Sequence, residues 1–154
     1  MNIQDLLKER ILVLDGAMGT MIQSHNLTAD DFGGPEYEGC NEYLNITRPD
    51  VIRDVYKAYL EAGADIVLTN TFGGTAVVLS EYHLEDQVYA INLAAARLLR
   101  EAVDAYNTPD HPRFAAASLG PQTKTISVTG GITFDEVTKA FYDETVPLIE
   151  GGAG

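Results

Sequence analysis

The chain has 154 residues, of which 45% are hydrophobic, and its 23 acidic residues outnumber 10 basic ones to give a net charge of −13. This length and composition are typical of one folded domain and exclude a disordered chain. The acidic balance excludes a protein that binds nucleic acid or an anionic membrane, because both surfaces need clustered Lys and Arg.

Short apolar runs alternate with longer amphipathic patterns along the chain. In chain order we expect a short helix near residues 3–9, a strand over 11–14, a helix over 51–60, a strand over 66–69, a helix over about 81–106, a strand over 114–118 and a helix from 134 to 148. The strand over 114–118 is the weakest of these predictions, because alanine is a poor strand former.

The helix ends carry recognisable signals. Two helices are preceded by the spacing of a capping box, Thr47 with Asp50 and Thr133 with Glu136. Gly63 is expected to end the helix over 51–60, and Pro147 is expected to kink the last turn of the final helix.

The predicted strands are apolar without alternation, which is typical of strands buried on both faces in a parallel sheet. Right-handed crossovers would place their carboxyl ends at one edge of the sheet. The segment "YLEAGADIVLTNTF" over 59–72 is echoed by "PLIEGGAG" over 147–154, where no strand follows. We expect a fourth strand beyond residue 154 and a truncated sheet with two open edges. The alternative is a natural, glycine-rich C-terminal tail.

The candidate site lies where these strands end, since ligands bind beyond the carboxyl ends of parallel strands. Asp15 follows the first run, and an aspartate there can face an ammonium group. Gly16, Ala17 and Gly19 allow a substrate carboxylate to approach backbone N–H groups. Together these features predict an amino-acid ligand. The alternative is that Asp15 only caps a turn.

Two other ligand classes are excluded at this turn. A haloacid-type phosphotransferase would carry a second Asp at position 17, and a phosphate-binding loop would need Gly-Lys-Ser/Thr. Asn70, between two threonines, is the candidate at the second strand, either as a ligand contact or to orient the next loop. After the third strand, the turn at Gly120-Pro121 and the polar residues over 123–125 form a further candidate lining or a plain surface loop.

Cys40 is the only cysteine, so the chain can form no internal disulfide and no thiolate metal cluster. We expect Cys40 to be a small packing residue, and His25, His83 and His111 show no ligand spacing. The N-terminal ten residues are too polar for a signal peptide, and no apolar run approaches the roughly 18 residues of a membrane span. These features predict a cytoplasmic protein.

Taken together, four motifs resemble the homocysteine S-methyltransferase family, and within it the homocysteine-binding domain of cobalamin-dependent methionine synthases. They are "VLDGAMGTMIQ", "GCNEYLNITRPDVIRDVYKAYLEAGADIVLTNTF", "INLAAARLLREA" and "SLGPQTKT". The resemblance implies an α/β fold of the (β/α)8 barrel type, of which residues 1–154 would form the N-terminal part, about three βα units.

The resemblance also assigns roles to residues. It implies that Asp15 contacts the amino group of homocysteine, and that Gly16, Ala17 and Met18 form the turn that approaches its carboxylate. Asn70 corresponds to the polar end of the second strand. In the family, a zinc ion held by three cysteines of later strands binds the homocysteine sulfur as a thiolate, and that thiolate attacks a methyl group. Methylcobalamin carries the methyl group in the methionine synthases and is the expected donor here, and betaine and S-methylmethionine are the alternatives.

Those cysteines, and the glutamate of the fourth strand, would lie beyond residue 154. We therefore assign no catalytic or metal-binding residue to this chain and expect it to bind neither zinc nor cobalamin tightly. The expected function is that of a fragment of a homocysteine methyltransferase barrel. The alternative is a non-catalytic half-barrel that binds the remainder of the barrel or another partner chain through its open sheet edges.

Overall fold

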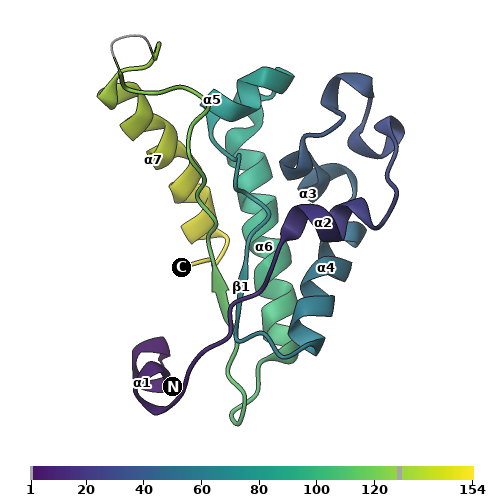
Figure 1. The fold of residues 1–154 in the computed structure, drawn as a ribbon, viewed down its shortest axis with the longest axis vertical. Helices are drawn as coiled ribbons and strands as arrows, with labels where there is room; N and C mark the ends of the chain where they lie inside the picture. Colours follow the sequence, from purple (N-terminus) through teal and green to yellow (C-terminus); the bar gives the residue numbers. More distant parts are fainter. Residues whose placement is uncertain (1, 128–129) are drawn as a thin grey trace.

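Three extended segments run parallel at the centre of the structure, a computed structural model that describes residues 2–127 and 130–154 (Figure 1). Strand β1 (Ile66–Leu68) pairs in parallel with β2 (Phe114–Ala116), with Ile66 opposite Phe114. The segment before Asp15 pairs with β1 through a parallel bridge between Leu14 and Ile66. The predicted parallel arrangement is therefore confirmed.

The helices alternate with these strands. In chain order they are α1 (Ile3–Glu9), α2 (Met18–Gln23), α3 (Leu44–Thr47), α4 (Pro49–Glu61), α5 (Ala76–Leu79), α6 (Val88–Tyr106) and α7 (Phe134–Glu150). Short 3-10 turns lie at η1 (Ala29–Phe32), η2 (Pro35–Tyr37), η3 (Asn41–Tyr43), η4 (Ser80–Tyr82) and η5 (Glu85–Gln87). No helix among the described residues is long and apolar enough to cross a bilayer.

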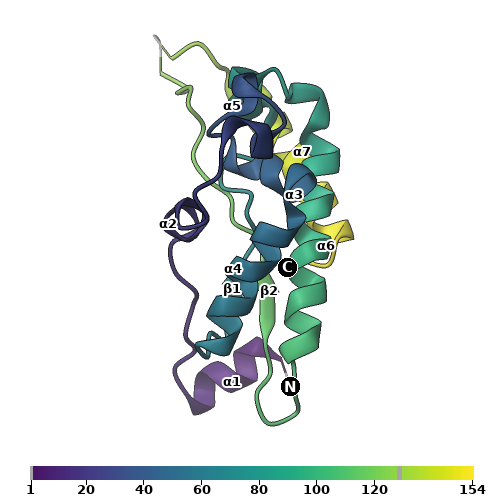
Figure 2. The same cartoon turned by 90° about the vertical axis from the view of Figure 1, so that its right-hand side faces the viewer.

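Helix α6 lies behind the strands, with α4 on one side and α7 on the other (Figure 1). Figure 2 shows the segment that leads into α2 on the side of the sheet away from α6. The main core fills the space between α4, α6 and the strands. Its almost fully buried members include Ile52, Val55, Tyr56, Leu60, Val67, Leu99 and Val103. This core fixes the strands, and with them the loops that follow each strand.

The first strand differs from its prediction. Only Leu14 of residues 11–14 makes a strand-like bridge, and Ile11, Val13 and Leu14 are 89%, 56% and 51% exposed. The segment pairs with β1 alone, and no described helix covers its outer face. Val67 of β1 is fully buried as expected. The apolar run was correctly placed as sheet-forming, but the burial on both faces was wrong here.

Two predicted helix starts were also wrong. Helix α4 begins at Pro49 with Arg48 at the N-cap, while Thr47 ends α3 and its hydroxyl donates to the Tyr43 carbonyl. Helix α6 begins at Val88 and not near residue 81, because His83 adopts a left-handed conformation with φ +56° that interrupts the helix. Helix α2 and the 3-10 turns over 29–43 were not predicted.

Other helix signals are confirmed. Thr133 caps α7, with reciprocal hydrogen bonds between Thr133 and Glu136 that form a capping box. Gly63, at φ +102°, follows the end of α4, where a left-handed residue favours glycine. Helix α7 continues through Pro147 to Glu150, and the kink expected at Pro147 stays a prediction.

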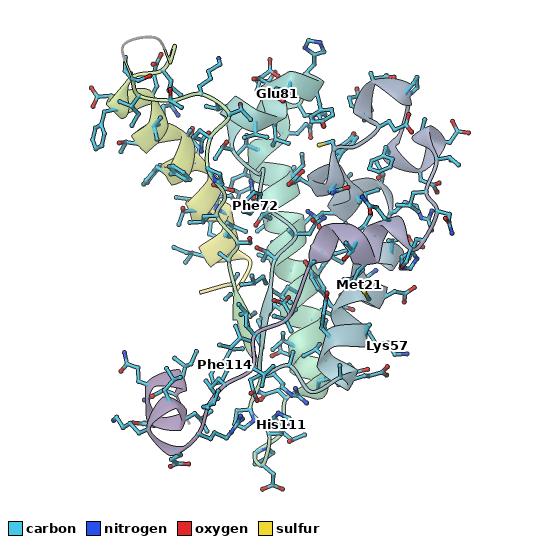
Figure 3. All side chains as sticks on the ribbon, viewed as in Figure 1. Met21, Lys57, Phe72, Glu81, His111 and Phe114 are labelled. Carbon is cyan, nitrogen blue, oxygen red and sulfur yellow. The ribbon has the colours of Figure 1, made fainter. Side chains whose placement is uncertain are left out.

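At the end of the sheet where the strands begin, Asp65 gathers four donors. The Arg10 guanidinium donates to both carboxylate oxygens at 2.8 and 2.7 Å, the Val13 N–H donates at 2.8 Å, and His111 Nε2 lies 2.9 Å away. His111, expected at the surface, has a 42% exposed side chain. Figure 3 shows His111 at this end of the sheet and Phe72 beyond the opposite end. The Asp65 cluster therefore lies far from the candidate site.

Candidate functional site

A cleft of about 310 Å³ lies at the carboxyl ends of the strands. Four of the five predicted binding residues line it, namely Asp15, Gly16, Met18 and Asn70. Ala17 does not line it, because the chain turns into α2 there and the Ala17 carbonyl accepts a hydrogen bond from Tyr59 Oη at 3.0 Å. The parallel sheet thus brings together residues 55 positions apart, as expected for loops that follow adjacent strands.

Asp15 is fixed by the neighbouring strand. Its backbone N–H donates to the Ile66 carbonyl at 2.9 Å, and its Oδ2 accepts from the Leu68 N–H at 2.9 Å. The other oxygen, Oδ1, is buried and has no hydrogen-bond partner among the described residues. Burial raises the pKa of this carboxyl above its usual range. Asp15 therefore presents an unpaired acceptor in a partly dry setting, which suits a cationic donor.

Asn70 orders the loop that forms another part of the wall. Its side-chain amide donates to the Asn41 carbonyl at 2.7 Å, and its own carbonyl accepts from Asn45 Nδ2 at 2.8 Å. Its backbone N–H donates to Tyr56 Oη at 3.0 Å. These contacts tie Asn70 to the preceding segment over 41–45 and to α4, while its role in orienting the next loop stays a prediction. A direct contact with a ligand remains a prediction.

Hydroxyl groups link the second and third strands beside the cleft. Thr69 Oγ1 and Thr71 Oγ1 are 2.5 Å apart, Thr71 Oγ1 donates to the Ser118 carbonyl at 2.9 Å, and the Ser118 N–H donates to Thr69 Oγ1 at 2.9 Å. All three residues line the cleft. The only indication of these three residues in the sequence was that each lies at or just after the end of an apolar run.

Glu42 is the second acidic residue of the cleft, and no motif in the sequence indicated it. It lies in η3, and its Oε1 accepts from the Gly73 N–H at 2.7 Å in the loop after β1. Glu42 and Asp15 are the only charged residues among those that line the cleft in the described part of the chain. The site therefore carries negative charge and favours a small ligand with a positive group.

For the loop after the third strand the sequence left open a polar lining or a plain surface loop, and residues 120–125 do not line the cleft. Gly120 lies directly against Phe72, where a Cβ atom would be 2.1 Å from the Phe72 carbonyl oxygen. Neither the turn at 120–121 nor residues 123–125 are among those lining the cleft, which Ser118 alone reaches from this loop. The loop thus positions Phe72, which does line the cleft, by close backbone packing.

The described residues do not fit a zinc–thiolate site. Cys40 is 1% exposed and packs among Leu79, Leu84 and other apolar side chains, as the sequence predicted. Burial raises the pKa of its thiol to about 12, which keeps the sulfur protonated. Within residues 2–127 and 130–154, no three His, Cys, Asp or Glu side chains gather in a way that could hold a metal ion.

Comparison with known proteins adds a family relationship. The model of a family described as homocysteine S-methyltransferase matches residues 12–154. The chain is 40% identical over 152 residues to a protein named methionine synthase from Mycobacterium leprae (strain TN), which covers 99% of this chain and 12% of that protein.

The fold has relatives among solved structures. The oxidized form of the homocysteine methyltransferase MmuM from Escherichia coli matches with a TM-score of 0.78 at 23% identity, over 98% of this chain and 53% of that one. Its apo form matches with a TM-score of 0.65 at 25% identity, over 96% and 49%. The chain thus spans about half of the MmuM structures and a small part of the methionine synthase.

Proposed function

Since the chain belongs to the homocysteine S-methyltransferase family, we propose that it forms the homocysteine-binding part of a methyltransferase barrel. The complete barrel would transfer a methyl group to the homocysteine sulfur and release methionine. The observation that carries the proposal is the unpaired, buried Oδ1 of Asp15 in a small acidic cleft at the carboxyl ends of parallel strands.

Each polar end of homocysteine has a counterpart in this cleft. The ammonium group would donate to Asp15 Oδ1, with the Glu42 carboxylate adding negative charge nearby. The carboxylate would meet the backbone of the turn formed by Gly16, Ala17 and Met18, of which Gly16 and Met18 line the cleft. Asn70 would hold the wall opposite this turn.

We further propose that residues 1–154 supply about three βα units of a (β/α)8 barrel. The parallel strands follow one another in chain order, as the strands of such a barrel do. Ile11, Val13 and Leu14 expose apolar surface on a strand edge, which a complete barrel would cover. The match to about half the length of MmuM is in keeping with this division.

The residues that would activate the homocysteine sulfur are not among those described. In the family, a zinc ion lowers the pKa of the thiol, and the donors of this chain do not fit that ion. We propose that the ligands come from the remainder of the barrel. We propose methylcobalamin as the methyl donor, supported by the 40% identity to a methionine synthase.

Calorimetric titration with L-homocysteine tests the proposal. We expect saturable binding at one site per chain, with methionine as a competitor, since both share the ammonium and carboxylate groups that the cleft would recognise. Homoserine, which keeps both groups and replaces sulfur by oxygen, is the matched ligand for the amino-acid end. A folded chain that binds none of the three would contradict the proposed site.

The exposed apolar edge also favours a second function, that of a non-catalytic half-barrel that binds a partner chain. Sedimentation measurements separate the two. A half-barrel of this kind would self-associate or bind an added complementary fragment, and Val13→Lys, on the exposed edge, would abolish that association. Leu7→Lys on α1, which is similarly exposed at 59%, is the control. A stable monomer that binds no apolar dye would contradict the second function.

A further inference from the structure

Glu144 is a carboxyl group buried without a partner. It lies in α7, its exposed fraction is 0%, and both of its carboxyl oxygens are buried without a hydrogen-bond partner among the described residues. A carboxylate in this setting would lose its hydration without compensation, which is strongly unfavourable. The side chain therefore needs either a donor or a proton.

Asn92, whose side chain also lies against Gly74, carries an unpaired acceptor. Asn92 of α6 is fully buried, and its side-chain amide donates to the carbonyls of Gly74 and Val88, each at 2.8 Å. Its Oδ1 has no donor among the described residues. A Cβ atom on Gly74 would lie 2.4 Å from Asn92 Oδ1 and 2.8 Å from Glu144 Oε1. Both oxygens therefore lie close to Gly74. Two acceptors can form a hydrogen bond with each other only if one of them carries a proton.

Gly74 belongs to the loop that continues from the cleft wall. On the side of this loop that faces the cleft, the Gly73 N–H donates to Glu42 Oε1. Glu42 and Phe72 both line the cleft. The loop is thus held from the cleft side by an acidic group and from the helix side by Asn92 and Glu144. Two carboxylates on either side of one short loop would repel each other, so the inner one is the one that must be neutral.

We propose that Glu144 is a positioning residue, protonated in the folded protein, whose carboxyl donates a hydrogen bond to Asn92 Oδ1 and thereby fixes the Gly73–Gly74 loop behind the candidate cleft. With this proton in place, Asn92 has its acceptor satisfied, and its amide holds the Gly74 carbonyl in a defined orientation. The loop can then present Phe72 and the Glu42 contact in one geometry. The proposal rests on the proposed function only in treating that cleft as the homocysteine site.

The electrostatic surroundings support the neutral form. Burial, and after it the charge of Glu42, raises the pKa of the Glu144 carboxyl to about 8. Glu42 comes from η3, while α6 contributes the neutral Asn92 and the β1–α5 loop contributes Gly74. No described cation faces Glu144 to favour its charged form.

A titration followed by carbon-13 NMR, with the label in glutamate side-chain carboxyls alone, tests the protonation directly on the wild-type chain. We expect one glutamate resonance to keep its protonated position at neutral pH and to titrate near pH 8, and to be missing in Glu144→Gln. If every glutamate resonance titrates in the ordinary acidic range, the proposal is overturned. No substrate is needed, so this result is independent of the proposed function.

The pH dependence of stability gives a second measurement. Between about pH 5 and about pH 8 the unfolded chain has released the Glu144 proton while the folded chain retains it, so stability falls as pH rises. The unfolding equilibrium constant of the wild type should therefore rise about tenfold per pH unit relative to that of Glu144→Gln and level off above pH 8. Glu85→Gln, at an exposed position, should follow the wild type. Parallel curves for wild type and Glu144→Gln would overturn the proposal.

Hydrogen exchange tests the positioning role. The Gly74 N–H donates to the Thr71 carbonyl at 2.9 Å, so its exchange reports on the loop. We expect Glu144→Met, which has no donor, to speed exchange at Gly74 at least tenfold, and Glu144→Gln, whose amide can donate to Asn92, to keep it slow. Equal exchange in the two variants would show that Glu144 only fills space, and would contradict its role as a positioning residue.

Discussion

One carboxylate oxygen of Asp15 accepts a hydrogen bond from the Leu68 N–H, and the other, Oδ1, has no partner among the described residues. Recognition of an ammonium group can therefore be assigned to this one atom. Asp15→Asn keeps the shape of the side chain and removes its charge. We expect homocysteine affinity to fall by about 1–3 kcal/mol, because an ammonium group would lose its charged partner in a partly buried site. Calorimetry on Asp15→Asn, with the exposed Asp54→Asn of α4 as control, measures this. Equal affinities would leave Asp15 as a structural cap.

Asp65 makes a contrasting prediction, about stability and not binding. Its side chain is 2% exposed, and the bidentate hydrogen bonds from Arg10 hold the pKa of its carboxyl well below the usual range. Asp65→Asn should lower the free energy of unfolding by about 1–3 kcal/mol at neutral pH, a range that allows for solvent around the part-exposed Arg10. Asp143→Asn, which breaks the exposed pair with Lys139, should cost under about 0.5 kcal/mol.

The Asp65 contribution also has a defined pH window. A carboxyl with a depressed pKa stabilises the fold above its unfolded pKa of about 3.9 and loses that contribution as the pH falls toward its folded value. Urea unfolding measured at pH 6 and at about pH 3 should therefore show that the free energy of unfolding falls more between these pH values for the wild type than for Asp65→Asn. If both lose the same amount, Asp65 is not the group that titrates.

The sequence indicated the site residues that lie next to a strand end and missed those that lie far from one. Asp15 and Asn70 directly follow apolar runs, so the parallel arrangement alone brings them to one edge. Glu42 and Asn41 reach the same cleft from η3, in a stretch of 3-10 turns whose path depends on contacts such as the Asn70 amide on the Asn41 carbonyl. Nothing local in "EGCNEYLN" carries that information.

The contact between α6 and α7 predicts a sharp difference between two C-terminal glycines. Gly151 follows α7 and is buried, and a Cβ atom there would lie 2.4 Å from the Cβ of Ala96, which is 0% exposed. Gly151→Ala should therefore cost about 1–3 kcal/mol of stability through overpacking. A Cβ on Gly154 would meet nothing within 4 Å. Thermal unfolding of Gly151→Ala and Gly154→Ala makes the comparison, and equal midpoints would show that α7 can shift without cost.

Helix boundaries show where local signals were sufficient. The Thr133–Glu136 capping box formed as expected, because both partners lie within the first turn and no neighbouring residue competes. The same spacing failed at Thr47 with Asp50, where α4 begins at Pro49, one residue later than the box requires, and Arg48 takes Asp50 as its partner. The left-handed His83 likewise overrode a helical periodicity that continued across it.

At the scale of the whole molecule, we expect the chain neither to bind zinc tightly nor to transfer a methyl group. Its one cysteine is buried with a pKa of about 12, and its described acidic and histidine side chains form no cluster of three. Zinc content after dialysis should be well below one ion per chain, and Cys40→Ser should not change it. Methyl transfer from methylcobalamin to homocysteine should not exceed the uncatalysed rate. One zinc per chain, or measurable turnover, would place metal ligands within these 154 residues.

The order of the strands has a consequence for how the protein is made. Each parallel segment pairs with the one that precedes it in the chain, from Leu14 to Ile66 and from β1 to β2. Each described strand after the first therefore finds its partner already synthesised, so each βα unit can dock as soon as it leaves the ribosome. We therefore expect nascent chains halted at successive lengths to gain resistance to proteolysis in steps, one step for each completed strand–helix pair.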